Sequence, residues 1–126
     1  MTVNMDDTED ISKINENELI KYYGYGKVFG KLQFRLKFAK SWILHSLADC
    51  SPHPGFTIKM QRARGVKIGK GCYIGPYVQI DLLYPELVTI EDNVAIGSNS
   101  MIFAHTNPAA NLYLKKKYYP RKLDPV

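Results

Sequence analysis

Residues 66–80 read VKIGKGCYIGPYVQI. Isoleucine recurs there at every sixth residue, and a second series with the same step follows. The two series are Ile68, Ile74 and Ile80, then Ile90, Ile96 and Ile102. Neither the 3.6-residue period of a helix nor the two-residue period of a strand accounts for this step. A hexapeptide repeat of this kind is typical of a parallel β-helix.

The spacing also predicts a geometry. Each hexad supplies one short strand with its isoleucine pointing inward, and three hexads close one coil. Stacked coils place Ile68 beside Ile90, Ile74 beside Ile96 and Ile80 beside Ile102, provided that residues 82–87 loop out between the series. We therefore expect a mainly β chain, with parallel strands from about residue 56 to residue 105 and all six isoleucines buried. An antiparallel sandwich with regular turns is the alternative, but it leaves the sixfold step unexplained.

The chain before the hexads has a different pattern. Residues 1–10 are expected to form an acidic flexible tail, residues 11–50 an amphipathic helical leader, and residues 51–126 the coils with a basic loop at their C-terminal end. The leader carries two apolar rows: Leu32, Leu36, Ala39, Ile43 and Leu47 in one, and Phe34, Phe38 and Trp42 in the other. Two rows imply two partners. One row is expected to cover the core, and the other to meet a neighbouring subunit or to make weak peripheral contact with a membrane.

Composition narrows the class of protein. The chain has 126 residues, a formal net charge of +5 and two cysteines, neither in a C-x-x-C pair. We expect one domain at most, free thiols and no metal site. The acidic N-terminus does not look like a signal peptide, and no apolar run is long enough to span a membrane. These features predict a soluble, cytoplasmic protein, and no nucleic-acid-binding motif accompanies the basic clusters.

Three segments carry a resemblance to a known family. They are GVKIGKGCYIGP at residues 65–76, VTIEDNVAIGSN at residues 88–99 and IFAHTNP at residues 102–108. They resemble the hexapeptide-repeat acyltransferases, in the branch that O-acetylates sugars and polysaccharides. The resemblance implies a left-handed coil, a homotrimer, and transfer of acetyl from acetyl-CoA to a hydroxyl or amine by direct attack, with a histidine as general base.

Two departures from the family pattern stand out. Relatives carry their histidine in a Thr-His-Pro step, which here reads Thr106-Asn107-Pro108. Relatives also continue for several more coils that line the acetyl-CoA groove, so the resemblance implies a chain truncated at its C-terminal end.

The candidate site follows from the resemblance. His105 is the expected catalytic base, with a surface loop histidine as the alternative, and His45 and His53 are expected to be structural. Asp81 and Tyr77 are the candidates for acceptor binding. The alternatives are that Asp81 only caps a turn and that Tyr77 only packs on the coil surface. Cys72 is expected to pack in the coil. No residue is assigned to acetyl-CoA. Its phosphates suit a basic set in the C-terminal loop: Lys115, Lys116, Lys117, Arg121 and Lys122. A solvated basic loop without a ligand is the favoured alternative.

Two other classes share the predicted architecture. A hexapeptide carbonic anhydrase needs three zinc-binding histidines, and only His105 lies near the coils. A non-catalytic β-helical scaffold, or a truncated fragment without activity, remains open. Binding of acetyl-CoA distinguishes an acetyltransferase from a scaffold.

Overall fold

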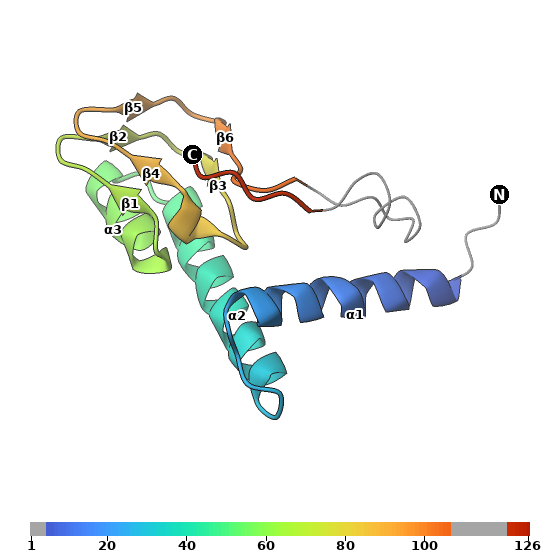
Figure 1. The fold of residues 1–126 in the computed structure, drawn as a ribbon. Helices are drawn as coiled ribbons and strands as arrows, with labels where there is room; N and C mark the ends of the chain where they lie inside the picture. Colours follow the sequence, from blue (N-terminus) through green and yellow to red (C-terminus); the bar gives the residue numbers. More distant parts are fainter. Residues whose placement is uncertain (1–4, 107–120) are drawn as a thin grey trace. The chain divides into compact units, whose positions relative to one another are not determined.

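The computed structural model describes residues 5–106 and 121–126 of the chain (Figure 1). Its helices are α1 (Met5–Tyr22), α2 (Gly30–Asp49) and α3 (Pro54–Arg64), with a short 3-10 helix η1 at Pro85–Leu87. Its strands are β1 (Lys67–Ile68), β2 (Tyr73–Ile74), β3 (Gln79–Ile80), β4 (Thr89–Ile90), β5 (Ala95–Ile96) and β6 (Met101–Ile102). The chain divides into two compact units. Among the described residues, one comprises 5–37, 106 and 121–122, and the other comprises Phe38–His105 and Leu123–Val126.

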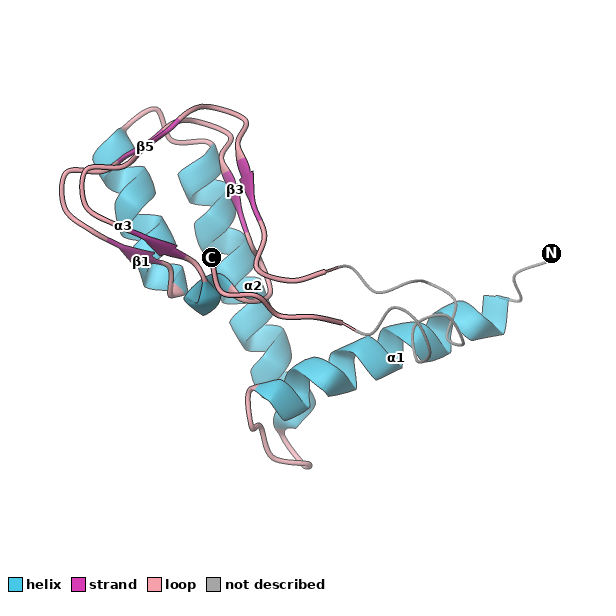
Figure 2. Ribbon diagram, turned by 45° about the horizontal axis from the view of Figure 1, so that its top comes forward, coloured by secondary structure: helices cyan, strands magenta, loops and turns pink. Residues whose placement is uncertain are grey.

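The expectation of a mainly β chain built as a left-handed parallel β-helix is wrong. The helices have 18, 20 and 11 residues and make up 45% of the structure. Each strand in the described ranges has only two residues, and the strands form three separate two-stranded sheets (Figure 2). Helices also replace two segments that we expected to be tail or strand. Helix α1 already begins at Met5, and helix α3 covers residues 54–64.

The pairing expected of the isoleucines is nevertheless confirmed. All three sheets are parallel, and their registers join Ile68 to Ile90, Ile74 to Ile96 and Ile80 to Ile102. Burial follows only in part: three of the six are buried and three are partly buried. The buried ones are Ile74, Ile80 and Ile90. The other three, Ile68, Ile96 and Ile102, are partly buried and pack against the core.

Residues between the strands turn the chain in a repeated way. Gly71, Tyr77, Asn93 and Asn99 all have a positive φ, from 59° to 67°. They recur with the same six-residue step as the isoleucines. Gly69 shows why small residues follow the strands. A Cβ on Gly69 would lie 2.7 Å from the backbone nitrogen of Asp92, because the second series passes directly over the first.

Helix α3 has clear end signals and packs against β1 and β2. Pro54 occupies its first turn, His53 Nδ1 accepts a hydrogen bond from the Phe56 amide, and Gly65 ends the helix with φ 111°. The core of this unit is apolar and consists of Val66, Ile74, Val78, Ile80, Val88, Ile90 and Ala104.

The other unit contains helix α1 and the start of helix α2. Leu19 is buried there, Arg35 forms an ion pair with Glu16 at 3.1 Å, and the Lys37 ammonium lies 4.1 Å from the centre of the Tyr23 ring. Among the described helices, none combines the length and apolar character needed to cross a membrane.

Candidate functional site

An aspartate that follows the first series of strands and a histidine that follows the second series meet in the unit that contains the strands. Asp81 follows β3, and its amide donates to the Ile102 carbonyl of β6 at 2.9 Å. This bond extends the β3–β6 pairing by one residue and brings His105 alongside. His105 Nδ1 lies 2.6 Å from Asp81 Oδ2. The structure therefore joins two of the residues that the sequence singled out.

Asp81 is held by hydrogen bonds on both carboxylate oxygens. Oδ1 accepts from the amides of Leu83 and Tyr84 at 2.9 and 3.0 Å, and Oδ2 accepts from the amide of Ala104 at 2.9 Å as well as from His105. The residue is 0% exposed. It caps the turn after β3, as one reading of the sequence expected, and it also holds the histidine. Full burial leaves no oxygen for an acceptor, so its role is to position His105.

The charge state of Asp81 follows from these contacts. Burial raises the pKa of the carboxyl group, but the hydrogen bonds from His105, Ala104 and Tyr84 outweigh burial, so the pKa lies below its ordinary value. Asp81 is therefore ionised at neutral pH, and a carboxylate only accepts hydrogen bonds. Its partner Nδ1 must carry a proton. In the neutral imidazole, the lone pair then lies on Nε2.

The His105 ring is fixed by packing as well. It makes edge contacts with Tyr84 and Phe103, at ring-centre distances of 5.3 and 6.4 Å. Its side chain is 7% exposed. The backbone of His105 forms an antiparallel bridge with Leu123. Nε2 has no hydrogen-bond partner among residues 5–106 and 121–126, so the atom that carries the lone pair is not engaged there.

A buried arginine fixes the backbone beneath this pair. Arg64, at the end of α3, donates through Nη2 to the carbonyls of Ile80 and Asp81 at 3.1 and 2.6 Å. Its Nε donates to Ser41 Oγ at 3.1 Å, and Ser41 in turn donates to the Leu82 carbonyl at 3.1 Å. Burial lowers the pKa of Arg64 to about 10, although Asp81 and Glu86 oppose this shift. The guanidinium therefore keeps its charge at neutral pH.

The remaining histidines have structural positions. His45 is buried in α2, and its Nδ1 lies 3.2 Å from Arg64 Nη1 and 3.4 Å from Gln61 Nε2. Burial lowers the pKa of His45, and the nearby Arg64 charge lowers it further, while Asp49 opposes both. His45 is thus a neutral acceptor in a polar network. His53 caps helix α3.

Other candidates from the sequence lie elsewhere or outside the described residues. Tyr77 is 59% exposed at a turn with φ 59°, and no hydrogen bond or ring contact joins it to Asp81 or His105. The Cys72 thiol donates to the Glu91 carbonyl at 2.9 Å, which suits packing. Outside the described residues lie Asn107, Lys115, Lys116 and Lys117. Arg121 forms an ion pair with Glu18 at 3.7 Å, and the Lys122 amide donates to Thr106 Oγ1 at 3.0 Å.

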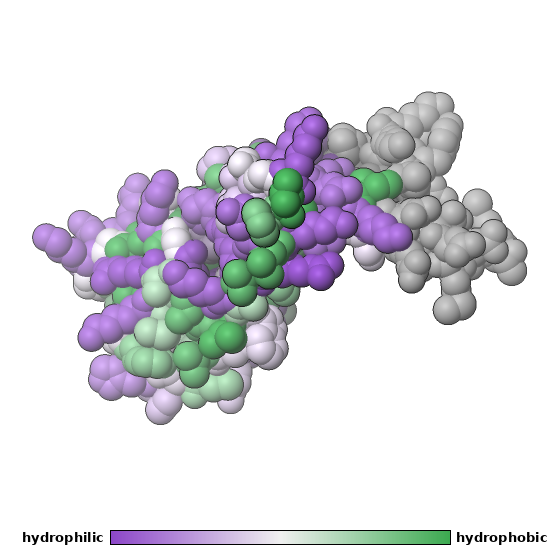
Figure 3. Space-filling view, turned by 90° about the horizontal axis from the view of Figure 1, so that it is seen from below, coloured by the Kyte–Doolittle hydropathy of each residue, from purple (hydrophilic) through white to green (hydrophobic). Residues whose placement is uncertain are grey.

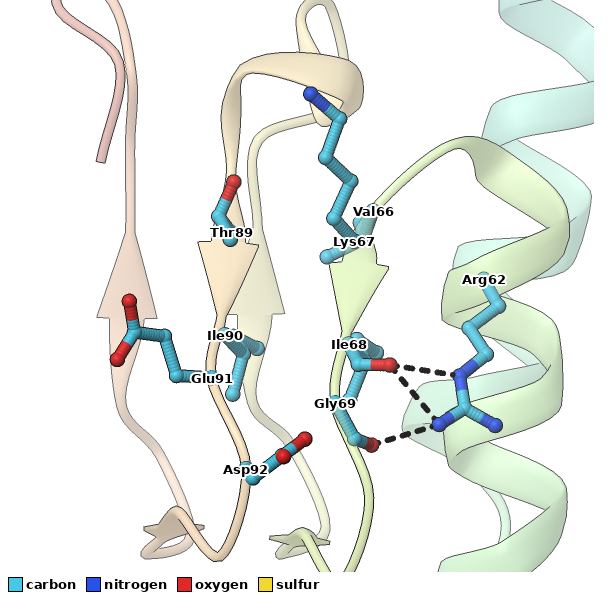
Figure 4. A pocket seen from close by; sticks show the side chains of 9 residues that line it. All are labelled: Arg62, Val66, Lys67, Ile68, Gly69, Thr89, Ile90, Glu91 and Asp92. Carbon is cyan, nitrogen blue, oxygen red and sulfur yellow. Dashed lines mark hydrogen bonds between the residues drawn. The ribbon is translucent and has the colours of Figure 1, made fainter.

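An open groove of about 680 Å³ lies along β1 and β4, and neither Asp81 nor His105 lines it (Figure 4). Its lining residues are Arg62, Val66, Lys67, Ile68, Gly69, Thr89, Ile90, Glu91 and Asp92. Arg62 is already bound to the carbonyls of Ile68 and Gly69, at distances from 2.7 to 3.1 Å. Lys67, Glu91 and Asp92 all line the groove, so its charges are mixed. We assign the groove no part in the chemistry.

The sequence pointed to His105 and Asp81 but not to the residues that support them. Tyr84 and Arg64 were missed, because a tyrosine beside a proline and an arginine in a basic helix both look like surface residues. Within the described part of the chain, no three His, Cys, Asp or Glu side chains gather closely enough to hold a metal ion. No protein-family model matches the sequence, and no curated protein or solved structure is significantly similar to it.

Proposed function

We propose that this protein transfers an acetyl group from acetyl-CoA to a hydroxyl or amine of a sugar or polysaccharide acceptor, with His105 as general base. The observation that carries the proposal is the 2.6 Å contact between His105 Nδ1 and the buried Asp81 carboxylate. It supports an imidazole that carries a proton on Nδ1, which leaves Nε2 as the nitrogen that accepts a proton from the acceptor. The acceptor class and the acetyl donor rest on the resemblance of residues 65–76 and 88–99 to the sugar O-acetyltransferases.

The reaction has two proton transfers through one nitrogen. Nε2 of His105 takes the proton from the acceptor hydroxyl as the oxygen attacks the thioester carbonyl. A C–O bond forms, and the tetrahedral intermediate then collapses with cleavage of the C–S bond. The departing thiolate takes the proton back from Nε2. Asp81 stays ionised throughout and stabilises the imidazolium that exists between the two steps.

Two further features of the proposal come from the sequence. The homotrimer implied by the resemblance is the proposed assembly. The cytoplasm is the proposed compartment, since both Cys50 and Cys72 are free thiols and disulfides persist mainly in oxidising compartments.

The test is an acetyl-transfer assay on the full chain with a panel of sugars and oligosaccharides. The product is detected by mass spectrometry as the acceptor plus one acetyl group. His105→Gln is expected to lower the rate by about 10²–10⁴-fold, the usual contribution of a general base. His53→Asn is the matched control, because asparagine also caps a helix, and its rate should equal that of the wild type. Absence of both acetyl transfer and acetyl-CoA binding would favour a scaffold.

A further inference from the structure

Helix α2 is oriented with its apolar stripe toward solvent. Side chains at intervals of three and four residues lie on one face of the helix: Leu32, Leu36, Ala39, Ile43 and Leu47. The four larger ones are 47–62% exposed. Trp42, one residue before Ile43, is exposed too. In the space-filling view, such apolar side chains lie at the surface among hydrophilic ones (Figure 3).

The opposite face of the same helix explains this orientation. Ser41, His45 and Ala48 are buried. Ser41 and His45 both contact the buried Arg64, and Ser41 donates to the Leu82 carbonyl. A polar network therefore fixes the rotation of the helix. Turning the leucines inward would break these bonds and leave the buried Nε of Arg64 without its Ser41 partner, at an energetic cost.

The charges beside the stripe indicate what covers it. Helix α2 contains Lys31, Arg35, Lys37 and Lys40, and it has no acidic residue before Asp49. At about 100° per residue, Lys40 borders the stripe on one side, and Lys31 lies on the other side, next to Trp42. Both are exposed, and neither has an ion-pair partner among the residues that the structure describes.

These charges disfavour a second copy of the chain as the partner. Two α2 helices packed through their stripes would bring the lysines of both copies to one seam, with no acidic side chain from residues 30–48 to pair with them. An anionic surface satisfies both features, because apolar side chains enter the lipid boundary while lysines meet the headgroups. A helix with Lys and Arg beside a face of Leu, Ile and Trp is typical of an interfacial helix.

We propose that helix α2 docks this protein on an anionic lipid bilayer, with the Leu32–Leu47 stripe facing the lipid. The inference is independent of the proposed acetyl transfer. Binding is expected to weaken as salt rises, since exposed charges are screened over about 8 Å at physiological ionic strength.

The test is co-sedimentation of the full chain with two kinds of vesicle. One is pure phosphatidylcholine, and the other contains one part phosphatidylserine to three parts phosphatidylcholine. The wild type is expected to bind the second kind and not the first. Lys31→Gln and Lys40→Gln should each weaken binding by about fivefold. The pair Ile43→Ser with Leu47→Ser should weaken it by about twentyfold, since both side chains are about half exposed.

Matched controls test whether the loss of binding is specific to this face of α2 or follows from removing any exposed lysine or apolar side chain. Lys59→Gln on α3 and Met101→Ser on β6 change exposed residues of the same kinds, and binding should be unchanged. Circular dichroism confirms that each variant is folded. Wild-type protein that stays in the supernatant with phosphatidylserine vesicles overturns the proposal. It is also overturned if the chain self-associates without lipid and the Ile43 and Leu47 variants abolish that association, because the stripe then belongs to a second copy.

Discussion

Replacing Asp81 by asparagine tests the geometry of the candidate site without removing a buried side chain. The carboxylate receives three backbone amides and the His105 imidazole. An asparagine has one oxygen and one NH₂ group, so it cannot accept all four bonds. The NH₂ group is expected to take the Oδ2 position, because there it faces the N–H of only one backbone amide. At the Oδ1 position it would face the N–H groups of two.

This placement has two consequences of predictable size. The Ala104 amide loses its acceptor in a buried position, and a buried unsatisfied group costs about 1–3 kcal/mol. The two amides at Oδ1 keep their bonds but lose the charge of the acceptor. We expect Asp81→Asn to lower the free energy of unfolding by about 2–4 kcal/mol in total.

The second consequence concerns the imidazole. An NH₂ group facing Nδ1 makes that nitrogen an acceptor, so the proton of the neutral ring moves to Nε2. The lone pair needed by a general base is then absent from Nε2, and activity should fall by about 10²–10⁴-fold.

Nitrogen-15 NMR of the histidine side chains measures the tautomer directly, once the pH has been raised until the nitrogen shifts no longer change. The wild type should show His105 protonated on Nδ1, and Asp81→Asn should show it protonated on Nε2. Asp92→Asn is the control, because Asp92 accepts one exposed amide bond from Lys70 at 2.7 Å. If wild-type His105 carries its proton on Nε2, or if Asp81→Asn leaves the tautomer unchanged, our account of the site is refuted.

Three other substitutions test the fold. Gly69→Ala should lower the free energy of unfolding by about 1–3 kcal/mol in a denaturant titration, because the added Cβ meets the backbone of the next series. Gly97→Ala is the control and should be neutral in the same titration, because its Cβ meets nothing within 4 Å. Tyr77→Asn should raise the unfolding midpoint, gaining about 1 kcal/mol, since asparagine tolerates a positive φ better than tyrosine; an unchanged midpoint would mean that the turn is not strained. The pKa of His45 is lowered in the folded state, so its contribution to stability is complete above about pH 6.5 and is lost as pH falls below that value. The melting temperature of His45→Gln should therefore depend less on pH in this range than that of the wild type. An equal dependence would contradict the burial of a neutral ring.

The sequence predicted local pairing well and the balance of secondary structure poorly. The six isoleucines specify which residues lie side by side. Because both series have the same six-residue step, every parallel pair joins residues that are the same distance apart in the sequence. The helical segments carry weaker signals. Helix α3 has a proline at its start and a glycine at its end, but its interior lacks a clean apolar stripe, since its buried residues are Thr57, Gln61 and Arg64.

The candidate site likewise has one part that the sequence predicted and one part that it did not. The pairing of Ile80 with Ile102 already places Asp81 near the residues after β6, so the contact with His105 could be predicted from the sequence. The support from Arg64 was not, because a buried arginine depends on partners from three separate segments. The orientation of helix α2 was hidden for the same reason. Hydrophobic pattern alone predicts leucines inside, and only the polar network around Ser41 and His45 reverses it.

The constant offset of the strand pairs has a consequence for how this protein folds. Each pairing joins residues twenty-two apart, as in Ile68 with Ile90. The first pair to form must close a loop of that length, which is entropically unfavourable. Once it exists, the next pair needs only the ordering of one further turn on each side. The three sheets should therefore form as a zipper, with one slow initiation and rapid propagation, and should give a single kinetic phase in refolding.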